Sequence, residues 1–430
     1  MIHEPEWVTH ALWWQLYPLG FVGAFPQKTP SATPATPAGH RLDRVLPWLD
    51  HAIELGASGL ALGPVFDSST HGYDTLDYLR IDPRLGDEDD FDRLITAAHA
   101  RGLRVMLDGV FNHVSARHPR YLAALRDGPQ SEAAAWFRRV DQGYQTFEGH
   151  PGLITLNHDH PEVQEYIVEV MCHWLERGAD AWRLDAAYAV PARFWAAALP
   201  RVRERFPEAW FVGEVIHGDY IEAVVAGQLD SVTQYELWKA IWSSLNDRNF
   251  HELDWTLQRH NALLDAFVPA TFIGNHDVTR IASRLEDARH LAHALVILLT
   301  VGGTPSIYAG DEYRFEGIKE ERLGGDDVIR PEFPAPEDVT QSPEASAIFR
   351  LYQELVGLRR RHPWLHRATT EALHLTSDQY VYRVSSTGRA LLVALNLADQ
   401  ALELELAGVT IQASAHGWAV IDVPSPVASV

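Results

Sequence analysis

The sequence has little cysteine and an excess of acidic over basic residues. Its one cysteine, Cys172, can form neither an intramolecular disulfide nor a cysteine-rich metal site, and its helical surroundings predict a packing role. Lysine and arginine number 36 against 58 aspartates and glutamates, for a formal net charge of −22. Because phosphate backbones and anionic membranes are bound through clustered positive charge, we expect no nucleic-acid or membrane partner. A neutral substrate fits this balance better.

The sequence also lacks a long apolar run. No stretch approaches the roughly 20 apolar residues of a transmembrane helix, and the opening MIHEPEWVTH has neither the basic nor the apolar region of a signal peptide. For a complete chain, these absences predict a cytoplasmic location. Hydrophobic residues make up 46% of the 430 positions, which is ample for a large globular core.

Strand-like and helix-like stretches alternate along most of the chain. Amphipathic segments separate the apolar runs, and the clearest predicted helix, 161–177, has Pro161 at its start and Gly178 after its end. Eight parallel strands joined by eight helices close most simply into an α/β fold, the (β/α)8 TIM barrel. The eight predicted strands are residues 11–17, 59–66, 103–111, 180–187, 210–215, 230–235, 269–274 and 304–310.

Three segments depart from this alternation. Residues 22–40 carry spaced prolines and no acidic residue, which predicts a long loop after the first strand. Residues 113–160 are too long for an ordinary connection and predict a small inserted subdomain after strand three. Short alternating runs predict a C-terminal β-sandwich domain at 363–430. The barrel is therefore assigned to residues 1–112 and 161–362.

Four of the predicted strands lead to an acidic side chain: Asp108, Asp185, Glu214 and Asp277. An unpaired carboxylate is costly to bury, so four in series predict a catalytic site at the carboxyl ends of the barrel strands. Arg183 shares a strand face with Asp185 and is expected to keep that carboxyl ionised. Apolar neighbours in the sequence predict a raised pKa for Glu214, as a proton donor needs. Such a pair suits glycoside chemistry.

The ordered motifs around these acids resemble those of the α-amylase superfamily, glycoside hydrolase family 13, over essentially the whole chain. They are DGVFNH, WRLDAA, GEV and GNHD, and together they are very specific. The resemblance implies a retaining double displacement on α-glycosides, with Asp185 as nucleophile and Glu214 as general acid/base. It implies that Asp277 distorts the sugar and stabilises the transition state. The nucleophile and acid should lie about 5 to 5.5 Å apart.

The resemblance also implies substrate-binding residues. Tyr73 would stack on the sugar in the first subsite, and His113, Arg183 and His276 would bind the same ring. Arg330, in the loop GGDDVIRPEF, could approach the non-reducing end of the substrate.

Other acidic and aromatic residues receive lesser roles. Asp74 and Asp108 are expected to be structural supports. Four aromatic residues of the insertion are candidate sugar platforms: Trp136, Phe137, Tyr144 and Phe147.

Two further stretches refine the resemblance. LITLNHDHPEVQEY and the arginine three residues after Asp277 are similar to the neopullulanase, cyclomaltodextrinase and maltogenic amylase group. This implies α-1,4-linked glucans or malto-oligosaccharides as substrates, with α-1,6-linked glucans as an additional class. That group carries an extra N-terminal domain that mediates dimers, whereas here the first predicted strand begins at residue 11, so the oligomeric state stays open. Thr70 replaces an aspartate of the family's exo-acting α-glucosidases, which favours endo-type cleavage or release of maltose-sized units.

Calcium is common in the family, but the segments that would hold it contain few ligands here. Calcium binds six to eight oxygens, and residues 22–40 and 113–125 supply no carboxylate. We therefore expect no metal and no cofactor, with one structural Ca²⁺ near Asn112 as the alternative. Two other functions stay open: a transglycosidase or glucoside isomerase with the same covalent intermediate, and an inactive carbohydrate-binding or interaction subunit. Retention of all three catalytic acids weighs against the last.

Overall fold

A computed structural model gives the architecture of the chain. It describes residues 4–24, 39–141, 143–322, 324–339, 342–406 and 408–423. Most of the loop predicted at 22–40 therefore lies outside the described residues. Within the described ranges, no helix is both long enough and apolar enough to span a membrane.

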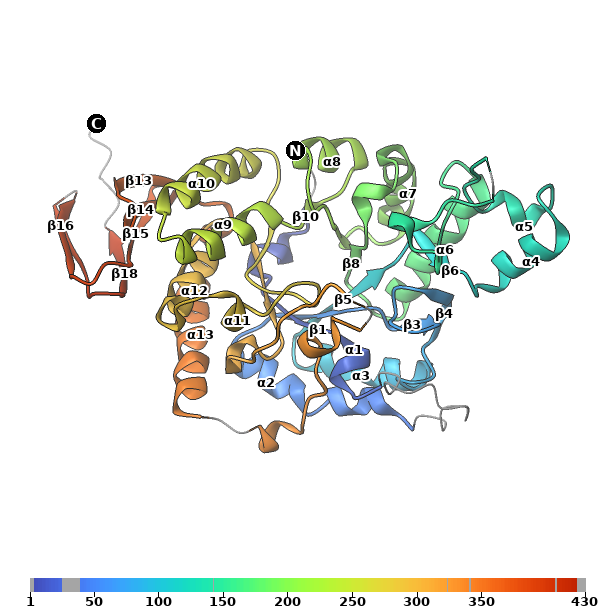
Figure 1. Cartoon of the computed structure of the whole chain (residues 1–430), viewed down its shortest axis with the longest axis horizontal. Coiled ribbons are helices and arrows are strands. Elements are labelled where there is room, and N and C mark those ends of the chain that lie inside the picture. Colours follow the sequence, from blue (N-terminus) through green and yellow to red (C-terminus); the bar gives the residue numbers. More distant parts are fainter. Residues whose placement is uncertain are drawn as a thin grey trace.

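Eight parallel strands form the centre of the molecule (Figure 1). They are hydrogen-bonded in the order β10-β9-β8-β5-β2-β1-β12-β11, and a parallel bridge between Thr233 and Ala270 joins the two ends into a barrel. This confirms the predicted TIM barrel, and every strand lies within its predicted run. The strands are β1 (Trp13–Leu16), β2 (Gly59–Leu62), β5 (Arg104–Gly109), β8 (Ala181–Leu184), β9 (Trp210–Gly213), β10 (Ser231–Val232), β11 (Ala270–Phe272) and β12 (Thr304–Tyr308).

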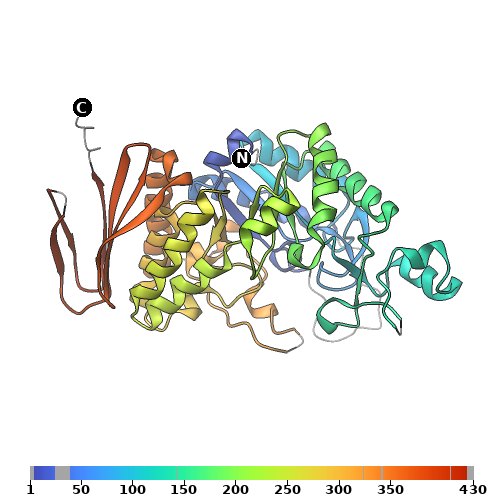
Figure 2. The ribbon, with the colours of Figure 1, turned by 90° about the horizontal axis from the view of Figure 1, so that it is seen from above.

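Helices connect the strands and cover the outside of the barrel (Figures 1 and 2). Helix α6 begins at Pro161, and Gly178 follows its end with a positive φ of 102°, as the sequence predicted. The strand predicted at 230–235 is shorter than expected, because the Gln234 side chain caps helix α9. The longer helices are α2 (Trp48–Leu55), α3 (Glu88–Ala100), α6 (Pro161–Glu176), α7 (Ala192–Arg205), α8 (Tyr220–Gly227), α9 (Tyr235–Asn246), α10 (Phe250–Leu264), α12 (Leu291–Thr300) and α13 (Pro343–Arg361); α1 (Pro18–Phe21) and α11 (Ile281–Arg284) are single turns.

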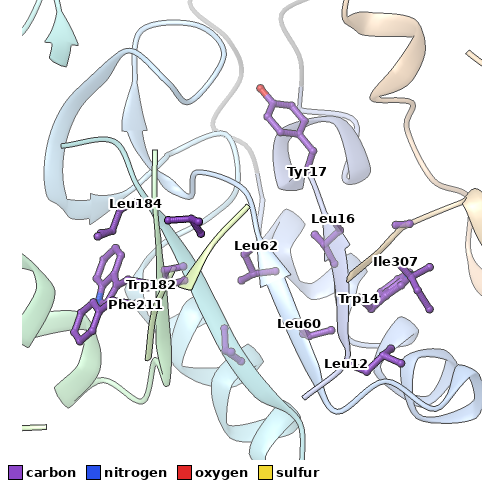
Figure 3. Close-up of a cluster of buried hydrophobic side chains, with 14 of the residues drawn as sticks. Leu12, Trp14, Leu16, Tyr17, Leu60, Leu62, Trp182, Leu184, Phe211 and Ile307 are labelled. Atoms are coloured by element: carbon purple, nitrogen blue, oxygen red, sulfur yellow. The ribbon is translucent and has the colours of Figure 1, made fainter. Parts of the chain in front are cut away.

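The barrel strands divide their side chains between two cores, because successive residues of a strand face opposite sides. Outward side chains such as Leu60 and Trp182 pack beneath the helices (Figure 3). Inside the barrel, Trp13 and Trp210 stack with ring centroids 6.0 Å apart, within a small apolar layer. The same alternation turns polar side chains inward nearer the carboxyl ends of the strands, among them Arg183, in β8. Strand register therefore determines which polar side chains face the inside of the barrel below the site.

Two excursions leave the barrel at the carboxyl ends of its strands. A hairpin of β3 (Phe66–Ser68) and β4 (Thr75–Ile81) follows β2. The predicted insertion follows β5 and contains β6 (His113–Ser115), α4 (Pro119–Asp127), α5 (Glu132–Ala135) and β7 (Leu153–Thr155), with β6 and β7 paired antiparallel. Figures 1 and 2 show the insertion at one end of the molecule, opposite the C-terminal strands.

The C-terminal strands form two antiparallel layers. One sheet contains β13 (Thr369–Leu375), β14 (Gln379–Ser386), β15 (Arg389–Asn396) and β18 (Trp418–Val423), and the other contains β16 (Leu402–Leu406) and β17 (Val409–Ala413). A buried apolar cluster that includes Val381, Leu392 and Ile411 lies between the layers. The opposite face of the larger sheet meets the barrel, where the hydroxyls of Tyr382 and Thr300 lie 2.9 Å apart. The C-terminal all-β domain is therefore confirmed.

Candidate active site

The four acids predicted from the sequence lie at the carboxyl ends of the barrel strands. Asp108 lies near the end of β5, while Asp185 and Glu214 directly follow β8 and β9. Ala186, beside Asp185, has a positive φ of 45°, and its N–H donates to Glu214 Oε2 over 3.1 Å. This tight turn after β8 brings two carboxyl groups to one side of the barrel mouth. Asp277 comes from the loop after β11.

Arg183 is the centre of this side of the site. It is only 8% exposed, and Nη1 lies 2.7 Å from Asp108 Oδ2 and 3.3 Å from Asp185 Oδ1. Its Nη2 lies 2.6 Å from Glu214 Oε1. One guanidinium is therefore shared by three carboxyl groups. Asp108 also accepts a 3.0 Å hydrogen bond from the Tyr73 hydroxyl, in keeping with a supporting role.

This sharing corrects the expected electrostatics of Asp185. Burial raises the pKa of the Asp185 carboxyl well above its usual range, and the charge of Glu214 raises it further. Arg183 acts in the opposite direction but does not prevail, because its guanidinium also contacts Asp108 and Glu214. The expectation that Arg183 lowers the pKa of Asp185 below its usual value is wrong for the free protein.

The expected surroundings of Glu214 are also corrected. The sequence places only apolar residues beside it, yet its carboxyl contacts Arg183 and the Ala186 N–H, and it accepts a 3.2 Å hydrogen bond from the Tyr235 hydroxyl. Asn275 in turn donates to that hydroxyl over 3.1 Å. Glu214 therefore has polar neighbours from residues 183–186 and from Tyr235, and Asn275 supports the Tyr235 hydroxyl from a third part of the chain.

Asp277 has the opposite electrostatic environment. Burial on its own would raise the pKa of this carboxyl, but His276 Nε2 at 2.9 Å and Arg330 Nη2 at 2.7 Å outweigh it. The pKa of Asp277 is held well below its usual range. Asp277 is thus an anion at neutral pH, whereas Asp185 resists ionisation.

Three further predicted residues line or support the opening of the site. The rings of Tyr73 and His276 stack almost in parallel, at 4° and 5.4 Å. His113 Nε2 lies 3.1 Å from the Tyr73 carbonyl oxygen, and its other face stacks on Phe147 at 4.5 Å. Burial lowers the pKa of His113 to about 3, so that this imidazole is neutral and can act as a hydrogen-bonding group.

A cavity of about 290 Å³ opens above these groups. Of the predicted residues, Tyr73, His113, Asp185, Glu214 and Asp277 line it, whereas Arg183, His276 and Arg330 lie behind its wall. The structure adds wall residues that the sequence did not single out: Glu148, Leu153, Ala186, Tyr188, Ile216, Tyr235, Val278 and Lys319.

Tyr188 and Glu148 connect the two rims of this cavity. The Tyr188 hydroxyl donates to Glu148 Oε1 over 2.6 Å, which joins the loop after β8 to the insertion. Glu148 has a positive φ of 48°, an uncommon backbone conformation for a residue other than glycine. A tyrosine shortly after the proposed nucleophile was the available signal for this bridge, but its partner lies 40 residues earlier in the chain.

Only one of the four predicted sugar platforms faces the cavity. Phe147 lines it, but Trp136 and Phe137 are 5% and 1% exposed and belong to the hydrophobic core of the insertion. Tyr144 packs edge-on against Phe137 and Tyr121. The aromatic content of the insertion therefore mainly supplies its own core.

Thr70 and Arg330 lie in positions that bear on cleavage mode. Thr70 Oγ1 donates to Asp74 Oδ2 over 2.7 Å, so that Asp74 stabilises the turn before Tyr73, in agreement with its predicted supporting role. Arg330 is 6% exposed and contacts Asp277, Asp326 and the backbone of the site. Together with His276, its guanidinium keeps the pKa of Asp277 low, and these contacts hold it within the site.

The candidate calcium position offers, in the described part of the chain, one unpaired side-chain oxygen, that of Asn112. Asn112 Oδ1 is buried and has no hydrogen-bond partner among the residues that the structure describes. One amide oxygen is a small part of the six to eight that calcium requires. Clusters of three or more carboxylate or imidazole ligands within the described ranges lie elsewhere.

Comparison with known proteins gives a consistent result. A family model of the α-amylase catalytic domain matches residues 15–152 and 131–345. A cyclomaltodextrinase from Bacillus sp. is 30% identical over 424 residues, which are 92% of this chain and 74% of the relative. Neopullulanase 2 from Thermoactinomyces vulgaris is 31% identical over 88% of this chain and 67% of its own length. A solved cyclomaltodextrinase structure matches with a TM-score of 0.84 and 27% identity, over 98% of this chain and 79% of that one.

Proposed function

The chain belongs to the α-amylase family, and on this premise we propose that it is a retaining hydrolase of α-1,4-linked glucans and malto-oligosaccharides. Asp185 is the nucleophile, Glu214 is the general acid/base, and Asp277 stabilises the transition state. Tyr73, His113 and His276 bind the reacting sugar ring, and Arg183 holds the catalytic carboxyls in place.

The reaction proceeds in two displacements. Glu214 gives its proton to the glycosidic oxygen as Asp185 Oδ attacks the anomeric carbon, so the bond to the leaving sugar breaks as an ester to Asp185 forms. Glu214, now a carboxylate, then removes a proton from water as the water oxygen attacks the same carbon. This releases Asp185 and restores the proton on Glu214, with the original anomeric configuration retained.

The shared guanidinium of Arg183 is the observation that best supports this assignment. It contacts both Asp185 and Glu214, so that the two carboxyls meet on one side chain. Burial and the charge of Glu214 raise the pKa of Asp185, so the two carboxyls are close enough to repel one another. The mechanism needs Asp185 ionised when the substrate is bound. The low pKa of Asp277 suits an anion that stabilises positive charge on the sugar ring.

The substrate assignment is drawn from the relatives and from Thr70. The matched relatives are named for cyclomaltodextrins and for pullulan, which makes α-1,6 linkages a reasonable second target. Thr70 is hydrogen-bonded within its turn and offers no carboxylate to a terminal sugar. We therefore propose endo-type cleavage or release of maltose-sized units. We also propose that the enzyme requires no metal or cofactor and that it is cytoplasmic.

Incubation with maltotetraose, a cyclodextrin and pullulan, with products and anomeric configuration followed by NMR, tests the proposal. We expect α-configured products from at least one of these glucans. The variant Asp185→Asn should be inactive, whereas the matched control Asp247→Asn, at an exposed position after α9, should retain full activity. Products of inverted configuration would refute the mechanism, and cleavage of trehalose or sucrose alone would refute the substrate assignment.

A transglycosidase remains the second candidate, because water and a sugar acceptor compete for one covalent intermediate. Tyr188 supports it. This side chain lines both the cavity above Asp185 and a neighbouring cavity of about 380 Å³, into which an acceptor sugar could bind. The ratio of free sugars to longer products in the same NMR experiment separates the two activities.

A further inference from the structure

Two histidines meet where the C-terminal domain contacts the barrel. His290 directly precedes α12, and His416 lies in the turn between β17 and β18. Their rings are nearly parallel, at 23°, and His290 Nε2 lies 3.1 Å from His416 Nδ1. Both side chains are largely buried, at 4% and 8% exposure. The imidazole nitrogens of two domains therefore point toward one another in a confined space.

Two carboxylates complete the arrangement. Asp287 Oδ2 lies 3.8 Å from His290 Nε2, and one ligand atom from each of Asp287, His290 and His416 lies within 4.8 Å of the others. On the far side of the His416 ring, Asp399 Oδ1 is 2.7 Å from Nε2. That contact assigns the His416 ring proton to Nε2, so His416 Nδ1 accepts a hydrogen bond from His290 Nε2. When an ion binds, the His290 ring proton moves to its own Nδ1, which leaves both facing nitrogens as ligands. A histidine oriented by a carboxylate in this way is the usual support of a metal-binding imidazole.

The separations suit a small tetrahedral ion. Bonds of about 2.0–2.1 Å from zinc to nitrogen or oxygen place neighbouring ligand atoms roughly 3.3 Å apart. The two nitrogens are 3.1 Å apart, close to this spacing, and the Asp287 carboxylate must move nearer from 3.8 Å. We propose that Asp287, His290 and His416 bind a Zn²⁺-type transition-metal ion that fastens the C-terminal domain to the barrel, with solvent as the fourth ligand. The position contributes nothing to glycoside cleavage.

The chemistry of the donors selects the class of ion. Two imidazoles and one carboxylate suit zinc and its neighbours, whereas calcium and magnesium prefer sites built mainly from oxygen. Arg289 also binds both oxygens of Asp287: its backbone N–H and Nε donate to Oδ1, each over 3.0 Å, and Nη2 donates to Oδ2 over 2.6 Å. A carboxylate oxygen has a second lone pair, so the ion and the guanidinium can share it, at some cost in affinity.

His416 also allows a clean variant. It has a positive φ of 50°, which asparagine tolerates better than most residues. His416→Asn therefore removes the imidazole with little backbone cost, whereas replacement of the buried His290 would combine ligand loss with a packing defect. Asp399→Asn keeps both imidazoles and weakens only the support of His416. His251→Ala, at an exposed position on α10, is the matched control.

The experiment uses the full chain after EDTA treatment and desalting. Zn²⁺ is titrated by calorimetry, Co²⁺ is added to record the intense visible absorption of tetrahedral coordination, and the unfolding midpoint is measured with and without Zn²⁺. We expect one ion per chain, a higher midpoint with Zn²⁺, and unchanged glycosidase activity. His416→Asn should abolish these effects, and Asp399→Asn should weaken binding about 10- to 100-fold. Absence of saturable binding to the native chain, or equal binding by His416→Asn and His251→Ala, would overturn the proposal.

Discussion

The two sides of the catalytic cavity treat the same chemical group in opposite ways. On the β8–β9 side, Asp185 is buried beside Glu214 and shares Arg183 with two other carboxyls, and its pKa is raised well above the usual range. On the β11 side, His276 and Arg330 serve Asp277, and its pKa is held well below that range. Burial acts on both carboxyls, but the charge of Glu214 adds to it at Asp185, whereas His276 and Arg330 outweigh it at Asp277.

The Asp185 carboxyl destabilises the folded state, whereas the Asp277 carboxyl stabilises it. Holding Asp185 close to Glu214 prepares a nucleophile and a proton donor but works against folding at neutral pH. Holding Asp277 between two cationic or hydrogen-bonding partners favours folding and also fixes an anion where the sugar develops positive charge. Neutralising each carboxyl should therefore remove activity on both sides but change stability in opposite directions.

The largest effect is expected for Asp185→Asn. Activity on maltotetraose should fall on the order of 10⁴-fold or more, as for loss of a nucleophile in a cooperating set. The same change relieves repulsion with Glu214, and Arg183 keeps Asp108 and Glu214, so the free energy of unfolding should rise by about 1 kcal/mol at pH 7. Steady-state rates and thermal unfolding of the same preparations test both parts. A lower unfolding midpoint than wild type would show that the Asp185 carboxyl does not destabilise the fold.

A smaller loss of activity is expected for Asp277→Asn. Removing one preorganised charge should reduce kcat about 10² to 10³-fold, with the covalent chemistry still available. Here stability should fall by about 1–2 kcal/mol, because Arg330 and His276 lose a charged partner at a site that is 30% exposed. Asp247→Asn, outside the site, should leave both quantities unchanged. If Asp277→Asn were as stable as wild type, the pairing with Arg330 would contribute nothing measurable.

The contributions of Asp185 and Asp277 to stability should also differ in their dependence on pH. For Asp185 the folded pKa is raised, so its unfavourable contribution is present at neutral pH and disappears as pH falls to the usual Asp range near about 3.9. For Asp277 the folded pKa is depressed, so its stabilising contribution is full above that range and is lost only as pH falls through the lower folded value. Unfolding midpoints between pH 8 and 4 should therefore converge for wild type and Asp185→Asn but remain apart for Asp277→Asn.

Strand register explains how far the sequence could predict this site. The acids were predictable because each follows an apolar run, and parallel strands bring their carboxyl ends together. The sharing of the Arg183 guanidinium among three carboxyls was not predictable from the sequence. It depends on strand pairing, which sets Asp108 opposite Arg183 and Leu184 opposite Gly213. Sequence neighbours of Glu214 gave no hint of the guanidinium that reaches it from β8.

The same limit applied to aromatic residues in the insertion. Their number suggested sugar platforms, but a subdomain of this size must first bury an apolar core of its own, and Trp136 and Phe137 serve that need. Phe147 is not part of that core; it lies in a short turn, stacks on His113 and lines the cavity. Contacts between the insertion and the barrel loops, such as Glu148 with Tyr188, join segments whose spacing in the sequence carries no signal.

The smallest effect is expected for Tyr188→Phe, which tests whether the Tyr188–Glu148 contact between the two rims affects substrate choice. The change removes the hydroxyl that holds Glu148 and keeps the ring, so the 147–149 turn loses a hydrogen bond to a charged group, worth about 1–2 kcal/mol. We expect kcat/KM for a cyclodextrin to fall about 5-fold through KM, because the larger substrate must pass the bridged rims, while kcat on maltotriose stays near wild type. Tyr144→Phe, in the same insertion but packed against Phe137, should change neither value. An equal fall in kcat on both substrates would instead indicate that Tyr188 positions Asp185.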